Sequence, residues 1–134
     1  MHSLLYVSTP CALPSPAELA RIISVAHANN PRESISGLLL WSDASFAQIL
    51  EGPGEAVDAM FARIRRDVRH RDVRPIARWA RSERRFAGSP MGLARLSERD
   101  CWRLLQRRTA PGDGGLGPWL SSLMLSATAA GPMA

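Results

Sequence analysis

Two polar side chains lie where the sequence predicts buried strands. Gln48 falls inside the run Phe46–Leu50, and Tyr6, the one tyrosine of the chain, falls inside the apolar run Leu4–Val7. Alternation along a strand puts Gln48 on one face together with both ends of its run. A buried amide must satisfy two N–H groups and an oxygen, and each missing bond costs about 1–3 kcal/mol. On neighbouring strands, Tyr6 and Gln48 would either satisfy each other or surround a polar heterocyclic ligand.

Three further residues have the chemistry or the position of a site, and each also has a structural explanation. Asn29 and Asn30 end the first predicted helix, where asparagine serves as a C-cap because it tolerates positive φ. A C-cap role explains one of these two asparagines well and the other less well. Met91 lies in a short apolar run and is most simply a core residue.

Other kinds of site are not indicated. The histidines and cysteines lack metal-ligand spacing; they are His2, His27, His70, Cys11 and Cys101. The sequence has no P-loop or dinucleotide-binding glycine motif. No Ser/His/Asp or Cys/His arrangement can be argued from residue order, so we do not expect an enzyme.

The elements that position these residues follow from apolar periodicity and turn signals. Strands are predicted at residues 4–7, 35–41, 46–50, 74–81 and 91–93. A first helix begins at the N-cap Ser15, with Pro16 in its first turn and Glu18 completing a capping box, and it ends at Asn29-Asn30-Pro31. A second helix is predicted at residues 55–66.

This order predicts an α+β fold of ferredoxin-like type, a βαββαββ sandwich in which a mixed sheet has two helices on one face. Pro75 suggests that the fourth strand begins there, at an edge. Short C-terminal helices are predicted at residues 98–108 and 118–127, joined by a glycine-rich link at 113–117.

Composition limits the classes of protein further. A length of 134 residues suits one domain, and 46% hydrophobic residues exclude a disordered chain. No apolar run approaches the ~20 residues of a membrane span, and the N-terminus does not resemble a signal peptide. Two cysteines build no disulfide framework, so we expect a cytoplasmic protein.

The basic residues are all arginine and are unevenly distributed. Residues 63–108 hold fifteen arginines against five acids, whereas residues 1–62 carry a net charge of −4. Guanidinium groups bind phosphate, so this block could form an anion or nucleic-acid surface. Aromatic residues do not interleave with it as a base-stacking platform requires. GC-rich codons and solvated helix and strand faces are simpler explanations, and nucleic-acid binding is the less favoured alternative.

Several motifs, taken in order, resemble the BLUF family of FAD-binding blue-light sensors. Leu4-Leu5-Tyr6-Val7-Ser8 resembles its first strand, and Phe46-Ala47-Gln48-Ile49-Leu50-Glu51-Gly52-Pro53 resembles its strongest signature. The other similar segments are Asn29-Asn30-Pro31 with Ser34-Ile35-Ser36-Gly37-Leu38-Leu39, Asp67-Val68-Arg69-His70, and Arg85-Phe86 with Met91-Gly92-Leu93. The resemblance covers about residues 1–95, and five motifs in register are far more specific than one.

The resemblance implies a non-covalently bound FAD between the two helices. Tyr6 and Gln48 would form the photoactive pair, and Met91 would pass the change to the last strand. Light would drive electron and proton transfer from Tyr6 toward the flavin, after which Gln48 rotates or changes tautomer and the flavin absorption shifts to the red. The other implied cofactor contacts are Asn29, Asn30, Ile22, Ile23, Asp67, Arg69 and His70.

The resemblance also implies a division of the chain. Residues 1–95 would form the flavin-binding domain, and residues 96–134 a C-terminal helical extension that includes the output region. We expect the chain to signal through a homo-oligomer or an unidentified downstream protein, with Trp102 and Trp119 marking the output surface. A membrane partner is not expected.

Four positions depart from the family pattern. Ser89 stands where tryptophan is frequent, and Pro90 lacks the N–H that a strand would use. Ala47 replaces a larger side chain, and Ser36 replaces a threonine. These departures leave a second alternative open, a degenerate light-blind relative that works as an interaction module.

Overall fold

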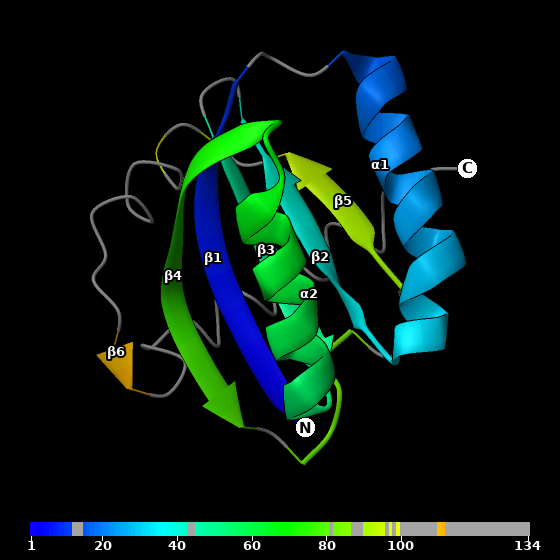
Figure 1. Cartoon of the computed structure of the whole chain (residues 1–134), viewed down its shortest axis with the longest axis vertical. Helices are drawn as coiled ribbons and strands as arrows, with labels where there is room; N and C mark the ends of the chain where they lie inside the picture. The colour runs from blue at the N-terminus through cyan, green and yellow to red at the C-terminus, as the bar shows by residue number, and fades with distance from the viewer. Residues whose placement is uncertain are drawn as a thin grey trace.

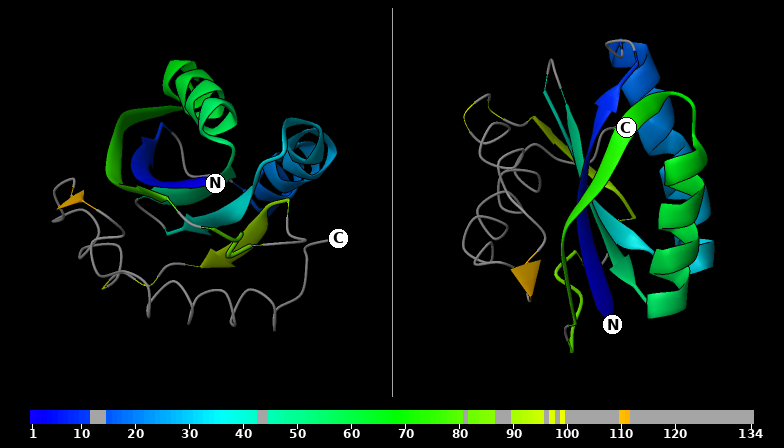
Figure 2. Two further views of the ribbon diagram at one scale, coloured as in Figure 1. Left: turned by 90° about the horizontal axis from the view of Figure 1, so that it is seen from below. Right: turned by 60° about the vertical axis from the view of Figure 1, so that its left-hand side comes forward.

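One mixed β-sheet with both helices on a single face makes up the described part of the protein (Figures 1 and 2). The computed structural model describes residues 1–11, 15–42, 45–80, 82–86, 90–95, 97, 99 and 110–111. The elements in order are β1 (His2–Pro10), α1 (Pro16–Asn29), the 3₁₀ helix η1 (Asn30–Glu33), β2 (Ser36–Trp41), β3 (Phe46–Gly52), α2 (Gly54–Arg66), β4 (His70–Ala80), β5 (Gly92–Arg95) and β6 (Ala110–Pro111). The predicted ferredoxin-like arrangement is confirmed, with β6 as an addition.

The strands of the sheet lie in the order β5-β2-β3-β1-β4-β6. β1 is central and runs antiparallel to both β3 and β4, whereas β5 runs parallel to β2. In the pairing of β1 with β3, Tyr6 lies directly opposite Gln48. Residues directly opposite each other in a ladder point to the same face, so the fold brings these two side chains together.

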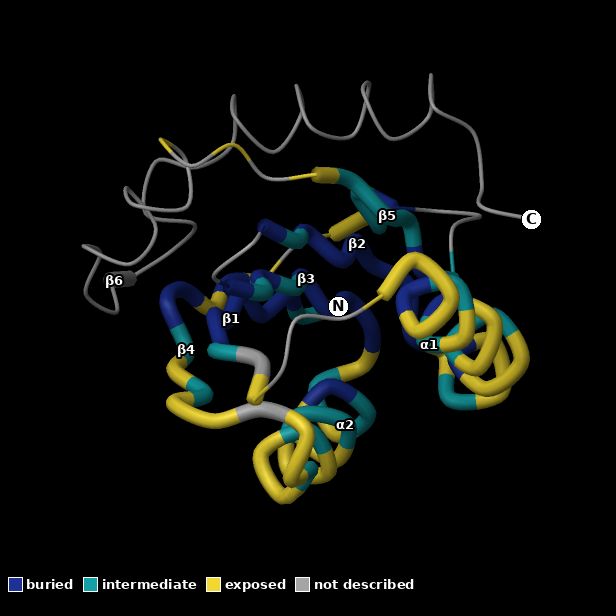
Figure 3. Tube along the Cα trace, turned by 90° about the horizontal axis from the view of Figure 1, so that it is seen from above, coloured by how far each residue is buried: buried dark blue, intermediate teal, exposed yellow. Residues whose placement is uncertain are grey.

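Both faces of the sheet are buried, as Figure 3 shows in dark blue for β1, β2 and β3. The core between the sheet and the helices contains Leu4, Tyr6, Ile35, Leu39, Leu50 and Met91, together with Ile23 of α1 and Val57 of α2. The opposite face includes Leu5, Val7, Leu38, Leu40, Ala47, Ile49 and Ile76. The apolar run in β2 is therefore buried on both sides, as its sequence predicts.

Helix α1 begins and ends where the sequence predicts, but the backbone conformation at its end differs. The Ser15 hydroxyl accepts a hydrogen bond from the amide N–H of Glu18 at 3.1 Å, which satisfies one of the unpaired donors of the first turn. At the other end, neither Asn29 nor Asn30 has positive φ, because the chain continues into η1. Asn30 is the C-cap of α1, as predicted, but its φ is −61°. The left-handed residue is Ser34, with φ of 59°, so the expectation of positive φ at the asparagines is wrong.

Strand β4 starts earlier than predicted. It begins at His70, so Pro75 lies inside the strand, opposite Tyr6, and does not mark its start. The register between β1 and β4 shifts between Leu5 and Tyr6. Such an irregularity accommodates a proline that cannot donate to the ladder.

Several expectations lie outside the described residues. They are the helices at 98–108 (apart from Arg99) and 118–127, the link at 113–117, the tryptophans of the output surface, Cys101 and Ser89. Within the described part, no helix has the length and apolar character to cross a membrane.

Candidate functional site

Tyr6 and Gln48 form the centre of the site. The Tyr6 hydroxyl donates a hydrogen bond to Oε1 of Gln48, and the tyrosine is 3% exposed. The sequence leaves open whether the two residues satisfy each other or surround a ligand; this contact establishes the first without excluding the second. The contact satisfies the amide oxygen of Gln48, whereas the two N–H groups of the amide need other hydrogen-bond partners.

Met91 supplies the second neighbour of the amide. Nε2 of Gln48 lies 3.4 Å from the Met91 sulfur, and Met91 is 2% exposed. A thioether sulfur accepts hydrogen bonds but has no hydrogen to donate. Met91 is therefore more than a core residue, because its sulfur matches only the orientation of Gln48 in which the nitrogen faces it.

Two side chains from the end of α1 and the start of η1 hold the segment that contains Met91. Nδ2 of Asn30 donates to the carbonyl oxygen of Pro90 at 2.8 Å. Nε2 of His27 lies 2.8 Å from the carbonyl oxygen of Met91. The chain thus connects α1, residues 90–91 and Gln48 through consecutive polar contacts.

The electrostatics of the centre keep Tyr6 protonated. Burial raises the pKa of the Tyr6 hydroxyl far above its ordinary value, and the negative charge of Asp67 raises it further. The hydroxyl is consequently a hydrogen-bond donor throughout the physiological pH range.

Apolar side chains from both helices surround the polar centre. Ile23 of α1 is 1% exposed, and Ile22 is half-buried beside the same cluster. From α2, the Phe61 ring lies 5.4 Å from the Tyr6 ring, centroid to centroid, at an interplanar angle of 51°. The centre therefore has apolar walls on two sides.

The predicted connector residues lie nearer the surface than Tyr6 does. Asp67 accepts bonds at 3.0 Å from the backbone N–H and from Nε of Arg69, and these bonds raise the pKa of Arg69. The Arg69 side chain is 67% exposed. Asn29 is exposed as well, and only the backbone of His70 is described. Asp67, Arg69, His70 and Asn29 are called the rim residues below.

Sequence reasoning missed His27, Pro90 and Phe61. His27 lies three residues before Asn30, a spacing that puts two side chains on one face of a helix, and this was the signal available. The partner carbonyls at residues 90 and 91 carried no signal, because any residue has a carbonyl.

Much of the arginine block is engaged within the chain. Four of its arginines form ion pairs: Arg63 with Glu33, Arg69 with Asp67, Arg71 with Asp72 and Arg78 with Asp58. The guanidinium of Arg84 donates to the carbonyl oxygens of Ser34 and Glu51. The described residues contain no cluster of His, Cys, Asp and Glu that could hold a metal ion.

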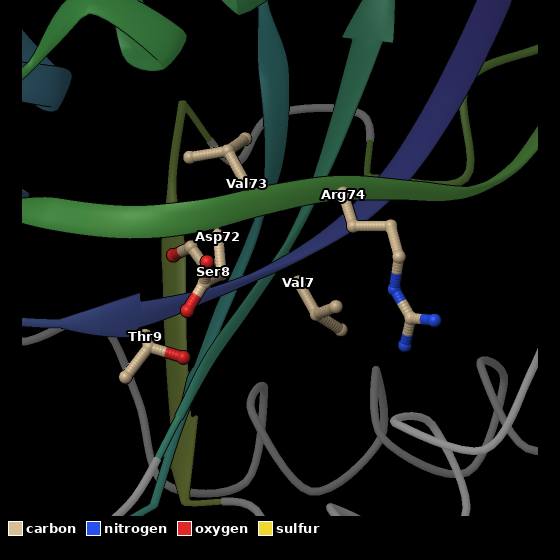
Figure 4. Close-up of a pocket in the computed structure, with 6 residues that line it drawn as sticks. All are labelled: Val7, Ser8, Thr9, Asp72, Val73 and Arg74. Carbon is tan, nitrogen blue, oxygen red and sulfur yellow. The ribbon is translucent and has the colours of Figure 1, made fainter.

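A cavity of about 500 Å³ lies where the end of β1 meets the start of β4 (Figure 4). Val7 and Arg74 extend to one side of the sheet there and Val73 to the other. The full lining is Val7, Ser8, Thr9, Asp72, Val73 and Arg74. Neither Tyr6 nor Gln48 nor Asn30 lines it, so this cavity is separate from the polar centre.

Comparison with known proteins agrees with the geometry. The sequence model of the BLUF family, described as sensors of blue-light using FAD, matches residues 1–92. The alpha subunit of the photoactivated adenylate cyclase of Euglena gracilis is 36% identical over 96 residues, which are 72% of this chain and 9% of that subunit. The blue light- and temperature-regulated antirepressor BluF of Escherichia coli (strain K12) is 33% identical over 85 residues, 62% of this chain and 21% of that protein.

A solved structure of a BLUF protein has a similar fold. The dark state of BlrB, a BLUF protein, superposes with a TM-score of 0.70 at 28% identity, covering 96% of this chain and 95% of that one. The chain spans 9% of the cyclase subunit, so the part they share is the sensor and not the cyclase. By its sequence match and its fold, the chain belongs to the BLUF family of flavin-binding blue-light sensors.

Proposed function

We propose that this protein is a blue-light photoreceptor that binds FAD between the two helices, beside the sheet face that carries Tyr6 and Gln48. It signals through the hydrogen bonds of Gln48. One observation carries the proposal: the half-buried amide of Gln48 lies between a tyrosine hydroxyl and a methionine sulfur, both of buried residues. The choice of FAD over other flavins rests on the description of the family. The protein turns over no substrate of its own.

The described residues fit a flat heterocycle with a polar edge. Asn30 is 4% exposed, yet within the described part of the chain its side chain makes one hydrogen bond, through Nδ2. Its Oδ1 and second N–H, together with the second N–H of Gln48, can serve a ligand that offers both donors and acceptors. Ile23 and Phe61 offer apolar surface for the faces of a ring.

Each predicted residue then has a place in the site. Asn30 and Gln48 hold the polar edge of the ring, and Ile22 and Ile23 contact its face. Of the rim residues, Arg69 and His70 are assigned to the polar part of the flavin and its phosphate-bearing chain, because a guanidinium pairs well with phosphate, and Asp67 supports the connector.

The bound flavin supplies absorption of blue light and an excited state that can take up an electron. The protein supplies an amide with two unequal orientations. In the orientation seen here, Oε1 of Gln48 accepts from Tyr6 and Nε2 faces Met91. In the reversed orientation, Nε2 would face Tyr6, whose oxygen can also accept, but Oε1 would face a sulfur that cannot donate. Reversal by light would therefore be metastable, and the original orientation would return in the dark.

The absorption spectrum of the purified protein tests this proposal. We expect bound FAD, identified by chromatography after heat release, and a red shift of a few nanometres under blue light that reverts in the dark. Gln48→Leu should keep the yellow colour and lose the shift, and Tyr6→Phe should do the same. A protein that binds flavin without any shift would be the light-blind alternative, and a normal shift in Gln48→Leu would refute the mechanism.

The same proposal divides the chain into a sensor, residues 1–95, and an output region, residues 96–134. The family match ends at residue 92 and β5 ends at Arg95, which supports this boundary. The output would be a contact with a second copy or with another protein, in the cytoplasm, where the exposed thiol of Cys11 would stay reduced. A chain truncated after residue 95 should keep the light-driven shift and lose any light-dependent change in association, measured by size-exclusion chromatography.

A further inference from the structure

The backbone that leads into β5 is held by a helix and not by the sheet. Pairing of β5 with β2 begins at Gly92, opposite Leu38, so residues 90 and 91 precede the ladder. Pro90 has no N–H to donate. The carbonyl oxygens of Pro90 and Met91 are instead bonded by the side chains of Asn30 and His27, each at 2.8 Å.

The contact of His27 with the Met91 carbonyl determines which ring nitrogen carries a hydrogen. A carbonyl oxygen only accepts, so Nε2 of His27 must carry the hydrogen in both the neutral and the charged form of the ring that makes this bond. His27 and Asn30 are three residues apart, and thus their side chains leave one face at the end of α1. Two adjacent carbonyls are therefore bonded by two side chains of a single turn.

The consequence falls on the sulfur of Met91. Fixing the carbonyl of Met91 fixes the peptide plane that follows its Cα, and the Met91 side chain extends from that Cα to within 3.4 Å of Nε2 of Gln48. The methyl of Met91 lies beside Gly37 of β2, since a Cβ added at that glycine would be 3.4 Å from Cε. Methionine has three flexible torsions, so its sulfur stays beside the amide only if its backbone does not move.

We propose that His27 is a positioning residue for the switch: its bond to the Met91 carbonyl holds the sulfur beside Gln48 and thereby sets the lifetime of the light-reversed state. The inference rests on the proposed function, whose residues Gln48 and Met91 it uses. His27 itself touches neither Tyr6 nor Gln48 in any hydrogen bond of the described structure.

Kinetics of dark recovery provide the first test. His27→Leu removes the donor to the Met91 carbonyl, so the Met91 sulfur is held less firmly beside Nε2 of Gln48. The dark return of the absorption shift should therefore slow by roughly threefold. His27→Gln keeps an N–H at about the same distance from Cα and should restore the wild-type rate. His27→Met is a second variant without a donor, in case the leucine variant does not fold. Arg21→Leu, an exposed change on the same helix, is the matched control and should leave the rate unchanged.

A second measurement reads the bond without light or flavin. Met91-Gly92 is the only Met-Gly pair in the sequence, so labelling with [1-¹³C]methionine and [¹⁵N]glycine gives a single ¹³C–¹⁵N correlation, that of the Met91 carbonyl. Loss of the hydrogen bond in His27→Leu should move the carbonyl frequency well beyond the change in Arg21→Leu. In His27→Gln it should return toward the wild-type position.

The outcomes separate the two proposals. A wild-type protein without any light-driven shift would refute the proposed function, and with it the role of His27 in lifetime, whatever the NMR result. A normal shift with an unchanged recovery rate in both donor-free variants would overturn the inference about His27 and leave the proposed function standing. Slower recovery without a carbonyl shift, or without rescue by glutamine, would also overturn it, because the effect would then not pass through this bond.

Discussion

Nε2 of Gln48 lies 3.4 Å from the sulfur of Met91, a residue 43 positions further along the chain. The sulfur can only accept, while the Tyr6 hydroxyl on the other side of the amide can accept or donate. The pair therefore gives the amide a preferred orientation that the tyrosine alone would not impose.

Replacing Met91 by leucine should remove this preference without removing the cofactor. The volume is nearly conserved, so we expect a loss of stability below about 1.5 kcal/mol. The reversed state should live longer, because the original orientation no longer gains a hydrogen bond. Time-resolved absorption after a blue flash measures the lifetime, and thermal unfolding measures stability. Recovery at the wild-type rate would show that the sulfur does not bias Gln48.

Alkaline pH should destabilise the protein through Tyr6. Its pKa is raised in the folded state, whereas in the unfolded chain it is about 10. The folded state thus keeps the proton while the unfolded state loses it, and stability should fall as the pH rises above about 10. The sequence suits this measurement, because it contains one tyrosine and no lysine.

Tyrosinate absorbance and the melting temperature together test that prediction. Between about pH 9 and 11.5 we expect Tm to fall, with tyrosinate appearing only as the protein unfolds. Tyr6→Phe should be stable over the same range, apart from any constant difference. Tyrosinate in the folded protein near pH 10 would contradict the burial of this hydroxyl.

Glu51 should contribute to stability through the loop between β4 and β5. It is fully buried, and its carboxylate accepts bonds from the Ser36 hydroxyl at 2.9 Å and from the backbone N–H groups of Arg85 and Phe86 at 2.7 Å. Glu51→Gln would turn an NH₂ group toward one of these donors, and we expect a loss of about 1–3 kcal/mol. Urea unfolding measures it.

The matched control is Glu55→Gln, an exposed position in the first turn of α2. It should change the free energy of unfolding by no more than about 0.5 kcal/mol. Equal effects of the two substitutions would mean that the buried carboxylate does not anchor residues 85 and 86.

Gly37 should be irreplaceable, whereas Gly54 should tolerate alanine. A Cβ at Gly37 would lie 2.0 Å from the carbonyl oxygen of Ile49, a backbone atom in the paired strand β3. Gly37→Ala should cost on the order of 4 kcal/mol or prevent folding. A Cβ at Gly54 would meet the ring of His2 at 2.9 Å, and that side chain can move aside. Alanine at position 54 also favours a helix, so soluble yield and Tm should stay near those of the wild type. A well-folded Gly37→Ala would refute this account of the β2–β3 pairing.

The sequence by itself determined the helices and strands and which residues share one face of a strand. The alternation in Phe46–Leu50 places Gln48 on one strand face with Phe46 and Leu50, and Ser15 with Glu18 defines the start of α1; both are local properties of a few residues. It also singled out Tyr6 and Gln48, because polar residues within apolar patterns stand out, whereas Asn30 was noticed as one of two asparagines at a helix end. The early start of β4 could not be predicted, since a proline such as Pro75 is excluded from a strand only where its missing N–H is needed, and that depends on the partner strand.

Tertiary structure alone decided how these residues work together. The Tyr6–Gln48 and Gln48–Met91 contacts join residues more than 40 positions apart, and their existence depends on the register of β1 with β3 and on the parallel pairing of β5 with β2. The sequence assigned no role to His27 beyond excluding a metal site, and only the fold places the Met91 carbonyl beside its ring. The physical reason is that a hydrogen bond depends on the positions of two atoms, and the sequence encodes the chemistry of each atom but only the complete fold determines the distance between them.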